Sequence, residues 1–331
     1  MRKATLLDIA EKANVSKTTV SMVLNNKKIS VSDATRQKIN DAVKELNYIP
    51  NTVARSLSTR KTETIGIVLP DIENPFFSEM ARAIEDTAGK LNYNIMFCNS
   101  DNNQDKEEKY VRLLISKLVD GVIFVSGGKS EQNLQMLENN NIPFVIVDRY
   151  IESSKEYNGV FCDNEEGIRL GVEYLYKNNK KKIAFVTGSQ KLKVAKLRLR
   201  AFEEVTKDLN IYNEHLIFQS EFTINGGMKA TEEIINSSNT VDAIFYSSDV
   251  MALGGFKLLT RKGYKIPEDI AIMGYDNINI SDLVEPELTT VAQPIYDMGK
   301  EACELLVGLI DGSRKEELVI LKPKLVIRGT V

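Results

Sequence analysis

The sequence has few of the residues on which enzymes and secreted proteins depend. Only one of its 331 residues is a histidine, His215, and it has no cysteine or serine arrangement nearby, which leaves little for acid–base or nucleophilic catalysis. The three cysteines, Cys98, Cys162 and Cys303, are far apart and in no metal-like spacing. We therefore expect buried free thiols, no metal site, no cofactor and no enzymatic activity.

Long apolar segments are also absent. No stretch approaches the roughly 18 consecutive apolar residues that span a bilayer. Asp8 and Glu11 lie where a signal peptide would have its apolar core. The sequence therefore predicts a cytoplasmic protein with no role at a membrane.

The net charge of −3 conceals an uneven distribution. The first 60 residues contain 11 Lys and Arg but 5 Asp and Glu, whereas the remaining residues contain 32 basic and 41 acidic side chains. A basic segment on an acidic body indicates that the first segment alone meets a polyanion, although a solvated basic face gives the same count.

Three short helices are expected in this basic segment. Thr5 begins a capping-box-like sequence before a helix over 6–13, and Ser16 is placed to cap a second helix over 17–24. A third helix over 32–46 has apolar residues at helical spacing. Two short helices joined by a tight turn and braced by a third are typical of a helix-turn-helix, although a three-helix bundle without a nucleic-acid role has the same pattern.

From about Ile65 the chain alternates predicted strands and helices, which is typical of doubly wound parallel sheets. The expected strands are Ile65–Leu69, Ile95–Cys98, Val122–Val125, Phe144–Val147, Val160–Cys162, Ile183–Thr187, Ala243–Ser247 and Ile270–Gly274. The expected helices are Phe76–Leu91, Lys106–Val119, Glu165–Lys177, Lys196–Leu209, Gly226–Ile235 and Val250–Lys262. This length of repeated units favours two sheets over one.

Polar and aromatic residues follow several of these strands, at the edge where parallel sheets bind ligands. They are Asp71, Asn74, Phe76, Phe77, Asp148, Arg149, Asp249 and Asp276. Aromatic faces stack on the C–H faces of sugars, and charged groups bind sugar hydroxyls, so the set favours a sugar. Each residue alone is weak support, because an aspartate at a strand end is about equally often a helix cap.

The strings VSKTTVSMVLNN and NYIPNTVARSLSTRKTETIGIVLPDIENPFF resemble those of the lactose-repressor (LacI) family, and the resemblance extends from Thr5 to the closing LVIRGTV. It implies an all-α helix-turn-helix DNA-binding domain at 1–48 and a hinge helix and linker at 49–60. It also implies an α/β periplasmic-binding-protein-like core at 61–331, made of two doubly wound parallel-sheet lobes. The N-lobe is expected at about 61–162 and 292–322, and the C-lobe at about 163–291 and 323–331.

The resemblance implies a set of DNA-binding residues on the helix-turn-helix and the hinge. The hinge leucine would wedge into the central base step, beside the hinge of a second subunit. Methionine stands at position 22 where the family usually has a guanine-reading arginine, so the family's operator does not carry over at that base pair. The set is Thr5, Leu6, Ser16, Lys17, Thr18, Thr19, Ser21, Met22, Asn25, Ala54, Arg55 and Leu57.

The resemblance also extends the expected effector site. Arg198 and Gln293 join the strand-end residues, because they occupy positions that bind the sugar in ribose-type members. Ser248 departs from the asparagine of those members, which weakens a ribose assignment without excluding a pentose. The full predicted set is Asp71, Asn74, Phe76, Phe77, Asp148, Arg149, Arg198, Ser248, Asp249, Asp276 and Gln293.

The sequence therefore predicts a homodimeric repressor of carbohydrate metabolism that binds near-palindromic double-stranded operator DNA and responds to a small sugar or sugar phosphate. The alternative is a catabolite-control-type regulator that responds to a phosphorylated carrier protein. Glu304 replaces an arginine that this subgroup uses to contact the carrier, and a carboxylate there would repel a phosphoserine. A periplasmic sugar-binding protein would need a signal peptide and would have no helix-turn-helix.

Overall fold

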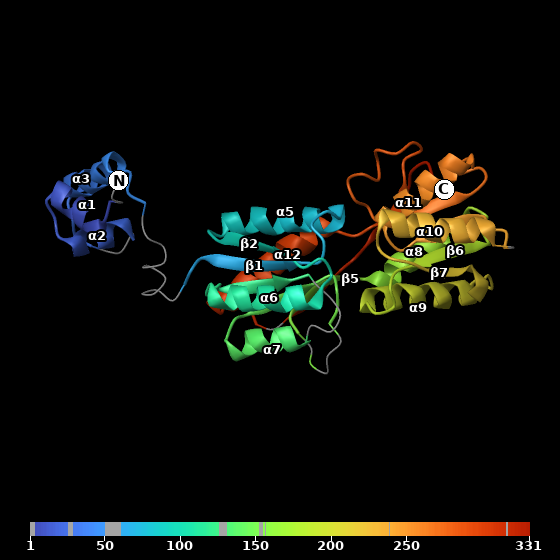
Figure 1. Cartoon of the computed structure of the whole chain (residues 1–331), viewed down its shortest axis with the longest axis horizontal. Helices are drawn as coiled ribbons and strands as arrows, with labels where there is room; N and C mark the ends of the chain where they lie inside the picture. The colour runs from blue at the N-terminus through green and yellow to red at the C-terminus, as the bar shows by residue number, and fades with distance from the viewer. Residues whose placement is uncertain are drawn as a thin grey trace. The chain divides into compact units, whose positions relative to one another are not determined.

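The computed structural model describes residues 4–25, 29–49, 61–125, 131–151, 155, 157–237, 239–315 and 317–331 (Figure 1). The chain divides into two compact units, Met1–Thr62 and Glu63–Val331, which we describe separately. Within the described ranges, no helix has the length and apolar character needed to cross a membrane.

The first unit contains three helices, α1 (Leu6–Ala13), α2 (Lys17–Leu24) and α3 (Asp33–Glu45). Each begins after a residue whose hydroxyl side chain accepts a hydrogen bond from a backbone amide of the first turn. These capping residues are Thr5, Ser16 and Ser32 respectively. At Asn14 the backbone takes a left-handed conformation, with φ of 52°, which ends α1 and starts the tight turn into α2.

Apolar side chains from all three helices meet in one small core. Ile9, Val20 and Ile39 are completely buried there, one from each helix. Because the spacing of the apolar residues places them on one face of each helix, the opposite faces remain polar and exposed. This arrangement is the helix-turn-helix predicted from the sequence.

The second unit is built on two six-stranded sheets. The first sheet has the order β11-β5-β4-β3-β1-β2, with strands β1 (Thr64–Leu69), β2 (Asn94–Asn99), β3 (Gly121–Phe124), β4 (Phe144–Val147), β5 (Gly159–Cys162) and β11 (Leu318–Leu321). The second has the order β12-β10-β9-β8-β6-β7, with strands β6 (Ile183–Thr187), β7 (Ile217–Gln219), β8 (Ala243–Tyr246), β9 (Ala271–Asp276), β10 (Thr289–Ala292) and β12 (Lys324–Val326). Strand pairs are parallel throughout the described sheets except for β10 with β12.

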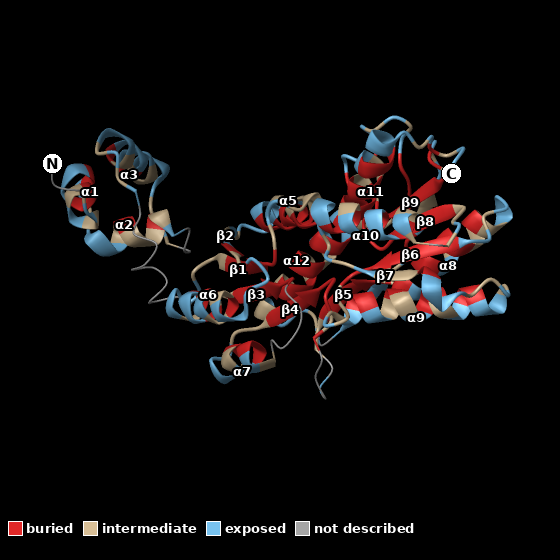
Figure 2. Cartoon of the chain, turned by 45° about the vertical axis from the view of Figure 1, so that its right-hand side comes forward, coloured by how far each residue is buried: buried red, intermediate tan, exposed pale blue. Residues whose placement is uncertain are grey.

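Helices cover both faces of each sheet, and the central strands between them are buried, whereas the edge strands β2, β7, β11 and β12 are partly exposed (Figure 2). The first sheet carries α5 (Pro75–Lys90), α6 (Gln104–Ser116), α7 (Glu131–Asn139) and α12 (Ile295–Asp311), and we call this assembly the first lobe. The second sheet carries α8 (Asn164–Lys177), α9 (Lys193–Asp208), α10 (Ile224–Asn236), α11 (Asp249–Lys262) and the 3₁₀ turn η1 (Glu214–Leu216), which together form the second lobe.

The chain passes between the two sheets three times. It leaves the first sheet after Cys162, returns between Ala292 and Ile295, and leaves again between Leu321 and Lys324. Apolar contact also joins the lobes, because Val250 and Ile278 of the second lobe pack into the core that α5 and α12 form on the first sheet.

The helices and strands predicted within the described residues are all present, with bounds that differ by at most three residues, whereas the predicted hinge helix at 49–60 lies outside them apart from Ile49. At α6 the helix begins earlier than predicted because the Asn103 side chain caps it, and it ends at Ser116 before Leu118 turns to φ of 56°. Helices α7 and α12 and strands β7, β10, β11 and β12 were not predicted. The fold class is the predicted one.

Candidate functional site

The helix-turn-helix presents polar side chains on the surface of α2. Lys17 and Thr18 are exposed at its start, whereas Thr19, Ser21 and Met22 are half-buried. The first turn of α2 carries no acidic residue. An exposed lysine beside the positive end of a helix dipole suits contact with a phosphate backbone.

Several predicted DNA-binding residues also stabilise the helices themselves. The Thr5 hydroxyl and Asp8 carboxylate form a capping box at the start of α1, and Leu6 follows half-buried. The Ser16 Oγ accepts a hydrogen bond from the Thr19 amide at 3.0 Å, and Asn25 Nδ2 donates to the Ser21 carbonyl oxygen at 2.7 Å. The hinge residues Ala54, Arg55 and Leu57 lie outside the described residues.

A cleft of about 340 Å³ lies between the two lobes of the second unit. Residues of both lobes line it: Asn74, Phe76, Phe77, Asp148, Arg149, Val194, Arg198, Phe222, Ser248, Asp276 and Gln293. Nine of the eleven predicted effector residues are therefore brought together. They come from strand ends and helix starts of separate βα units, which meet at the carboxyl edges of the two sheets.

The aromatic part of the cleft is formed at the start of α5. Asn74 Oδ1 accepts a hydrogen bond from the Phe76 amide at 3.1 Å and so caps this helix. Phe76 and Phe77 follow in the first turn, with their ring centroids 5.1 Å apart and nearly perpendicular. Pro75 at the first helical position fixes the backbone there, which orients both rings.

Asp148 and Arg149 follow β4 on the first lobe, and both are buried. The Arg149 guanidinium lies 5.0 Å from the Phe77 ring centroid and donates to Asn102 Oδ1 at 2.7 Å. Burial raises the pKa of Asp148, and the charges of Arg198 and Arg149 oppose that shift. The pair supplies one carboxylate and one guanidinium to the cleft.

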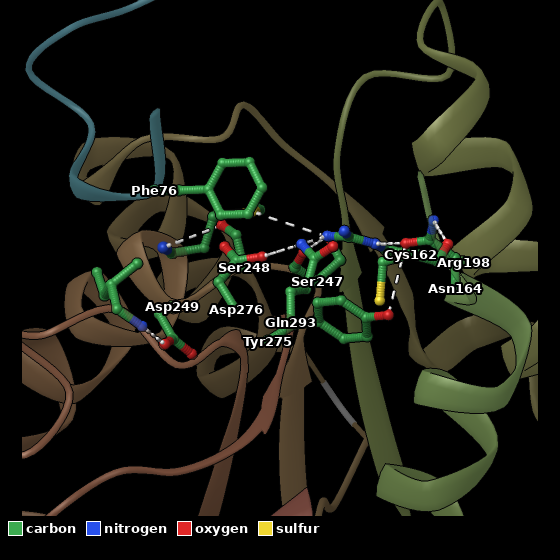
Figure 3. A network of polar contacts seen from close by, with 12 residues as sticks. Phe76, Cys162, Asn164, Arg198, Ser247, Ser248, Asp249, Tyr275, Asp276 and Gln293 are labelled. Atoms are coloured by element: carbon green, nitrogen blue, oxygen red, sulfur yellow. Dashed lines mark hydrogen bonds and ion pairs between the residues drawn. The ribbon is translucent and has the colours of Figure 1, made fainter. Parts of the chain in front are cut away.

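Arg198 supplies the second guanidinium and is held on several sides (Figure 3). Its Nε donates to Asn164 Oδ1 at 2.7 Å, and its Nη1 donates to the Ser247 carbonyl oxygen at 2.6 Å. The guanidinium also lies 3.9 Å from the Tyr275 ring centroid and 3.9 Å from Asp276 Oδ1. A planar cation held in this way is presented in one orientation.

Asp276 and Gln293 complete the polar wall. Gln293 Nε2 donates to Asp276 Oδ1 at 2.7 Å, whereas the buried Gln293 Oε1 has no hydrogen-bond partner among the described residues. Burial raises the pKa of Asp276 well above the ordinary range, against the opposing charge of Arg198. The wall therefore offers an unused acceptor and a carboxylate to a ligand.

Two predicted effector residues lie elsewhere. Asp71 lines a wider, adjoining part of the cleft, together with Lys191 and Glu221. Asp249 does not line the inner cleft: it is completely buried, and its carboxylate accepts hydrogen bonds within the second lobe. Its place at a strand end suggested the ligand role, but Ser248, the residue before it, is the one that reaches the cleft.

The prediction from sequence did not include several residues of the site. Phe222 and Val194 line the cleft, and Asn164 and Tyr275 hold Arg198. Phe222 follows β7, a strand of three residues that gives too short a pattern to recognise. Asn164 begins α8 directly after a crossing between the lobes, a position that only the three-dimensional arrangement relates to Arg198.

The cleft contains two carboxylates and two guanidinium groups beside aromatic rings. This composition suits binding of a hydroxyl-bearing ligand. Within the described ranges, no group of three or more His, Cys, Asp and Glu side chains could hold a metal ion. The three cysteines are free and buried, and burial raises the pKa of the Cys162 and Cys303 thiols to about 12.

Comparison with known proteins assigns both units. The family model of bacterial regulatory proteins, lacI family, matches residues 5–51, and that of the periplasmic binding protein-like domain matches residues 172–331. The ribose operon repressor of Halalkalibacterium halodurans is 38% identical over 98% of this chain and 96% of its own length.

Two solved structures extend the likeness. A lac repressor dimer bound to operator and the anti-inducer ONPF matches with a TM-score of 0.89 at 28% identity, over 99% of each chain. A LacI family transcriptional regulator from Enterococcus faecium with bound ribose matches with a TM-score of 0.73 at 30% identity, over 81% of this chain and 98% of the other. With its helix-turn-helix and its two-lobed core, the chain belongs to the lacI family of DNA-binding transcriptional regulators.

Proposed function

We propose that this regulator is a homodimeric repressor whose affinity for operator DNA is set by a small uncharged sugar of the pentose class, bound in the cleft. The observation that carries the proposal is the pairing of Phe76 and Phe77 with two carboxylates, two guanidinium groups and an unpartnered Gln293 Oε1 in one cleft. The ribose named for two of its relatives supports the same class.

The chemistry of the cleft favours a sugar over other small ligands. The C–H faces of a sugar stack on aromatic rings, and its hydroxyls donate to carboxylates and accept from guanidinium groups. Burial raises the pKa of Asp148 and of Asp276, so the cleft disfavours negative charge, and an added phosphate would need compensation in this buried site. A neutral polyhydroxyl ligand needs no such compensation.

For DNA binding we propose the predicted division of the chain into a helix-turn-helix at 1–48, a hinge at 49–60 and two lobes. The two-fold symmetry of a dimer matches a near-palindromic operator, with one half-site for each helix-turn-helix. The site residues are those given above, with Asp249 removed from the ligand contacts. Because operator DNA is the binding partner, we place the protein in the cytoplasm and assign it no catalytic step.

A ligand that contacts both lobes favours one closure of the cleft over others, and it shifts the equilibrium only by its differential affinity for the two states. Short helices are marginal in water, so a small change in the spacing of two hinges is enough to decide whether they fold on DNA. We expect a coupling free energy on the order of 1–3 kcal/mol between sugar and operator.

The carrier-protein alternative receives less support. Glu304 lies half-buried on α12, with its carboxylate 3.9 Å from Lys300 Nζ. In the catabolite-control subgroup that the sequence resembles, an arginine at this position contacts the phosphorylated carrier, and a carboxylate in its place repels a phosphoserine. The inner cleft, by contrast, has an unsatisfied acceptor that a small ligand would satisfy.

Thermal unfolding of the full chain with a panel of sugars tests the proposal. A ligand at 100 times its Kd adds about 2.7 kcal/mol to the free energy of unfolding. We expect D-ribose or another pentose to raise the Tm, and ribose 5-phosphate to raise it less at equal concentration. A Tm that rises with a phosphorylated carrier protein and with none of the sugars would contradict the proposal.

A further inference from the structure

Asp249 is buried behind the effector cleft rather than in it. We infer that Asp249 is a positioning residue: its carboxylate holds the turn after β9 in the conformation that presents Asp276 to the sugar. This inference rests on the proposed function for the role of Asp276, but the geometry that supports it is independent of any ligand.

The turn after β9 has an unusual backbone. Asp276 has φ of 124° and Asn277 has φ of 60°, two consecutive residues in a region that side chains other than glycine rarely adopt. Each such residue raises the free energy of the native state and persists only where its surroundings fix it. Since the conformation of Asp276 sets where its carboxylate points, the groups that fix this turn also determine the shape of the cleft.

The Asp249 carboxylate supplies that constraint. Its Oδ2 accepts from the Ile278 amide at 2.9 Å and from Ser281 Oγ at 2.6 Å, and the Asn277 amide adds a further hydrogen bond. Backbone donors at two successive residues directly after Asp276 are thus tied to one side chain. Arg328 Nη2 also donates to Asn277 Oδ1 at 2.8 Å, and the Gln293 amide donates to the Asp276 carbonyl oxygen at 3.1 Å, so these bonds support the turn together with Asp249.

The second carboxylate oxygen connects the same residue to the neighbouring strand. Asp249 Oδ1 accepts from Thr290 Oγ1 at 2.6 Å, and Thr290 lies opposite Gly274 in the β9–β10 pair. A Cβ on Gly274 would lie 2.1 Å from Asp249 Oδ1, so only glycine at this position of β9 leaves room for the carboxylate. Asp249 therefore contacts both strands whose ends carry Asp276 and Gln293.

A direct ligand role and a simple helix-start role both explain these contacts less well. An ionised carboxylate has about four lone-pair sites, and buried donors within the protein use them. An acidic residue that served only the dipole of α11 would not need partners in a loop and a strand outside that helix. The hydrogen-bond partners of Asp249 instead lie on the segment 277–281, which follows Asp276, and on the strand 289–292, which precedes Gln293.

The test compares Asp249→Asn and Thr290→Val with the matched control Thr231→Val. Asparagine keeps the shape of Asp249 but replaces one acceptor oxygen with a donor, and Thr290→Val removes a single hydroxyl donor. Thr231 is completely buried in the same lobe, where its hydroxyl pairs with Tyr246 Oη at 2.6 Å, away from Asp276. Thr231→Val thus measures the effect of losing a buried hydroxyl that does not bond to Asp249.

The first readout is the crystal structure of each sugar-free variant. We expect Asp249→Asn to release the turn, so that Asp276 leaves its positive φ and loses the hydrogen bond from Gln293 Nε2. If Asp276 keeps its positive φ and its hydrogen bond from Gln293 Nε2 in Asp249→Asn, the inference is overturned, whatever the natural effector is. If Asp249→Asn does not fold, the structure of Ser281→Ala decides the question in the same way, because this substitution removes a donor to the Asp249 Oδ2 atom that holds the turn.

The second readout is D-ribose affinity by titration calorimetry, with operator affinity measured without sugar. We expect ribose affinity to fall by about 10- to 100-fold in Asp249→Asn, by less in Thr290→Val, and not in Thr231→Val, while operator affinity stays the same. Equal ribose affinity in Asp249→Asn and the native chain would count against the positioning role. If the native chain binds no sugar, the proposed function fails, and the crystal structures alone test Asp249.

Discussion

Gln293 Nε2 donates a hydrogen bond to Asp276 Oδ1 at 2.7 Å, while Gln293 Oε1 on the same side chain is buried and has no partner in the part of the chain that the structure describes. This relationship orients the amide, because the end that carries the donor is fixed by the carboxylate. A buried acceptor without a donor costs about 1–3 kcal/mol. A ligand hydroxyl in the cleft would recover that free energy, which links the geometry of the cleft to the chemistry of its effector.

Asp276→Ala should abolish the response to sugar and leave operator affinity without sugar near that of the native chain. The substitution removes a cleft carboxylate but no residue of the helix-turn-helix. Operator affinity with and without D-ribose, measured by fluorescence anisotropy, checks this prediction. A variant that still responds at an unchanged ribose concentration would show that the effector binds elsewhere.

Sugar binding should release protons in a pH range above the ordinary carboxyl pKa. Burial raises the pKa of Asp276 in the sugar-free protein, and sugar hydroxyls that donate to the ionised form would lower it. Sugar affinity should therefore rise with pH through this range. Without sugar, Asp276 holds a proton in the folded protein at pH values at which it is ionised in the unfolded chain. The contribution of Asp276 to the free energy of unfolding therefore falls as pH rises through the same range.

Titration calorimetry in two buffers of different ionisation enthalpy measures this proton release. Asp276→Asn is the matched control, because an amide keeps the shape of the side chain and does not titrate. The apparent enthalpy of binding should depend on the buffer in the native chain only. A buffer-independent enthalpy for the native chain throughout this range would refute the assignment of an ionised Asp276 to the bound state.

Lys17→Ala should reduce operator affinity and the salt dependence of binding together, if the exposed Lys17 ammonium contacts phosphate. Loss of one phosphate contact lowers the slope of log affinity against log salt by about 1. Affinity measured over a series of salt concentrations gives this slope. An unchanged slope with relaxed preference at one base pair would instead assign Lys17 to base reading.

Leu57→Ala should weaken specific binding much more than non-specific binding, since an apolar wedge acts only where the duplex is kinked. The energetics of unstacking a base step indicate a loss of a few kcal/mol on operator DNA. Competition between operator and random-sequence duplexes measures the difference. Equal losses on both DNAs would remove Leu57 from the wedge role.

The fold could be predicted from the sequence wherever local patterns are strong. The capping hydroxyls of Thr5 and Ser16 and the apolar spacing after them define α1 and α2 almost to the residue. The two edge strands of the second sheet were missed, because β7 and β12 have only three residues each. Strands this short do not establish a period.

The sequence could predict those cleft residues that lie at the ends of strands. Asp148 and Asp276 follow buried strands and reach the site, but Asp249 follows a strand in the same way and does not. The difference depends on which donors surround each carboxylate, and those donors come from residues up to 41 positions away in sequence. Asn164 was missed for the same reason, since it acts through Arg198, 34 residues further along the chain.

The central claim is that sugar and operator bind to one switch, and thermodynamic reciprocity tests it most directly. D-Ribose affinity of the full chain should be measured by titration calorimetry, alone and with saturating operator, beside operator affinity with and without saturating ribose. The two pairs of affinities should differ by the same factor, about 5- to 150-fold. Ribose that binds with the same affinity in the presence and absence of operator would contradict the claim.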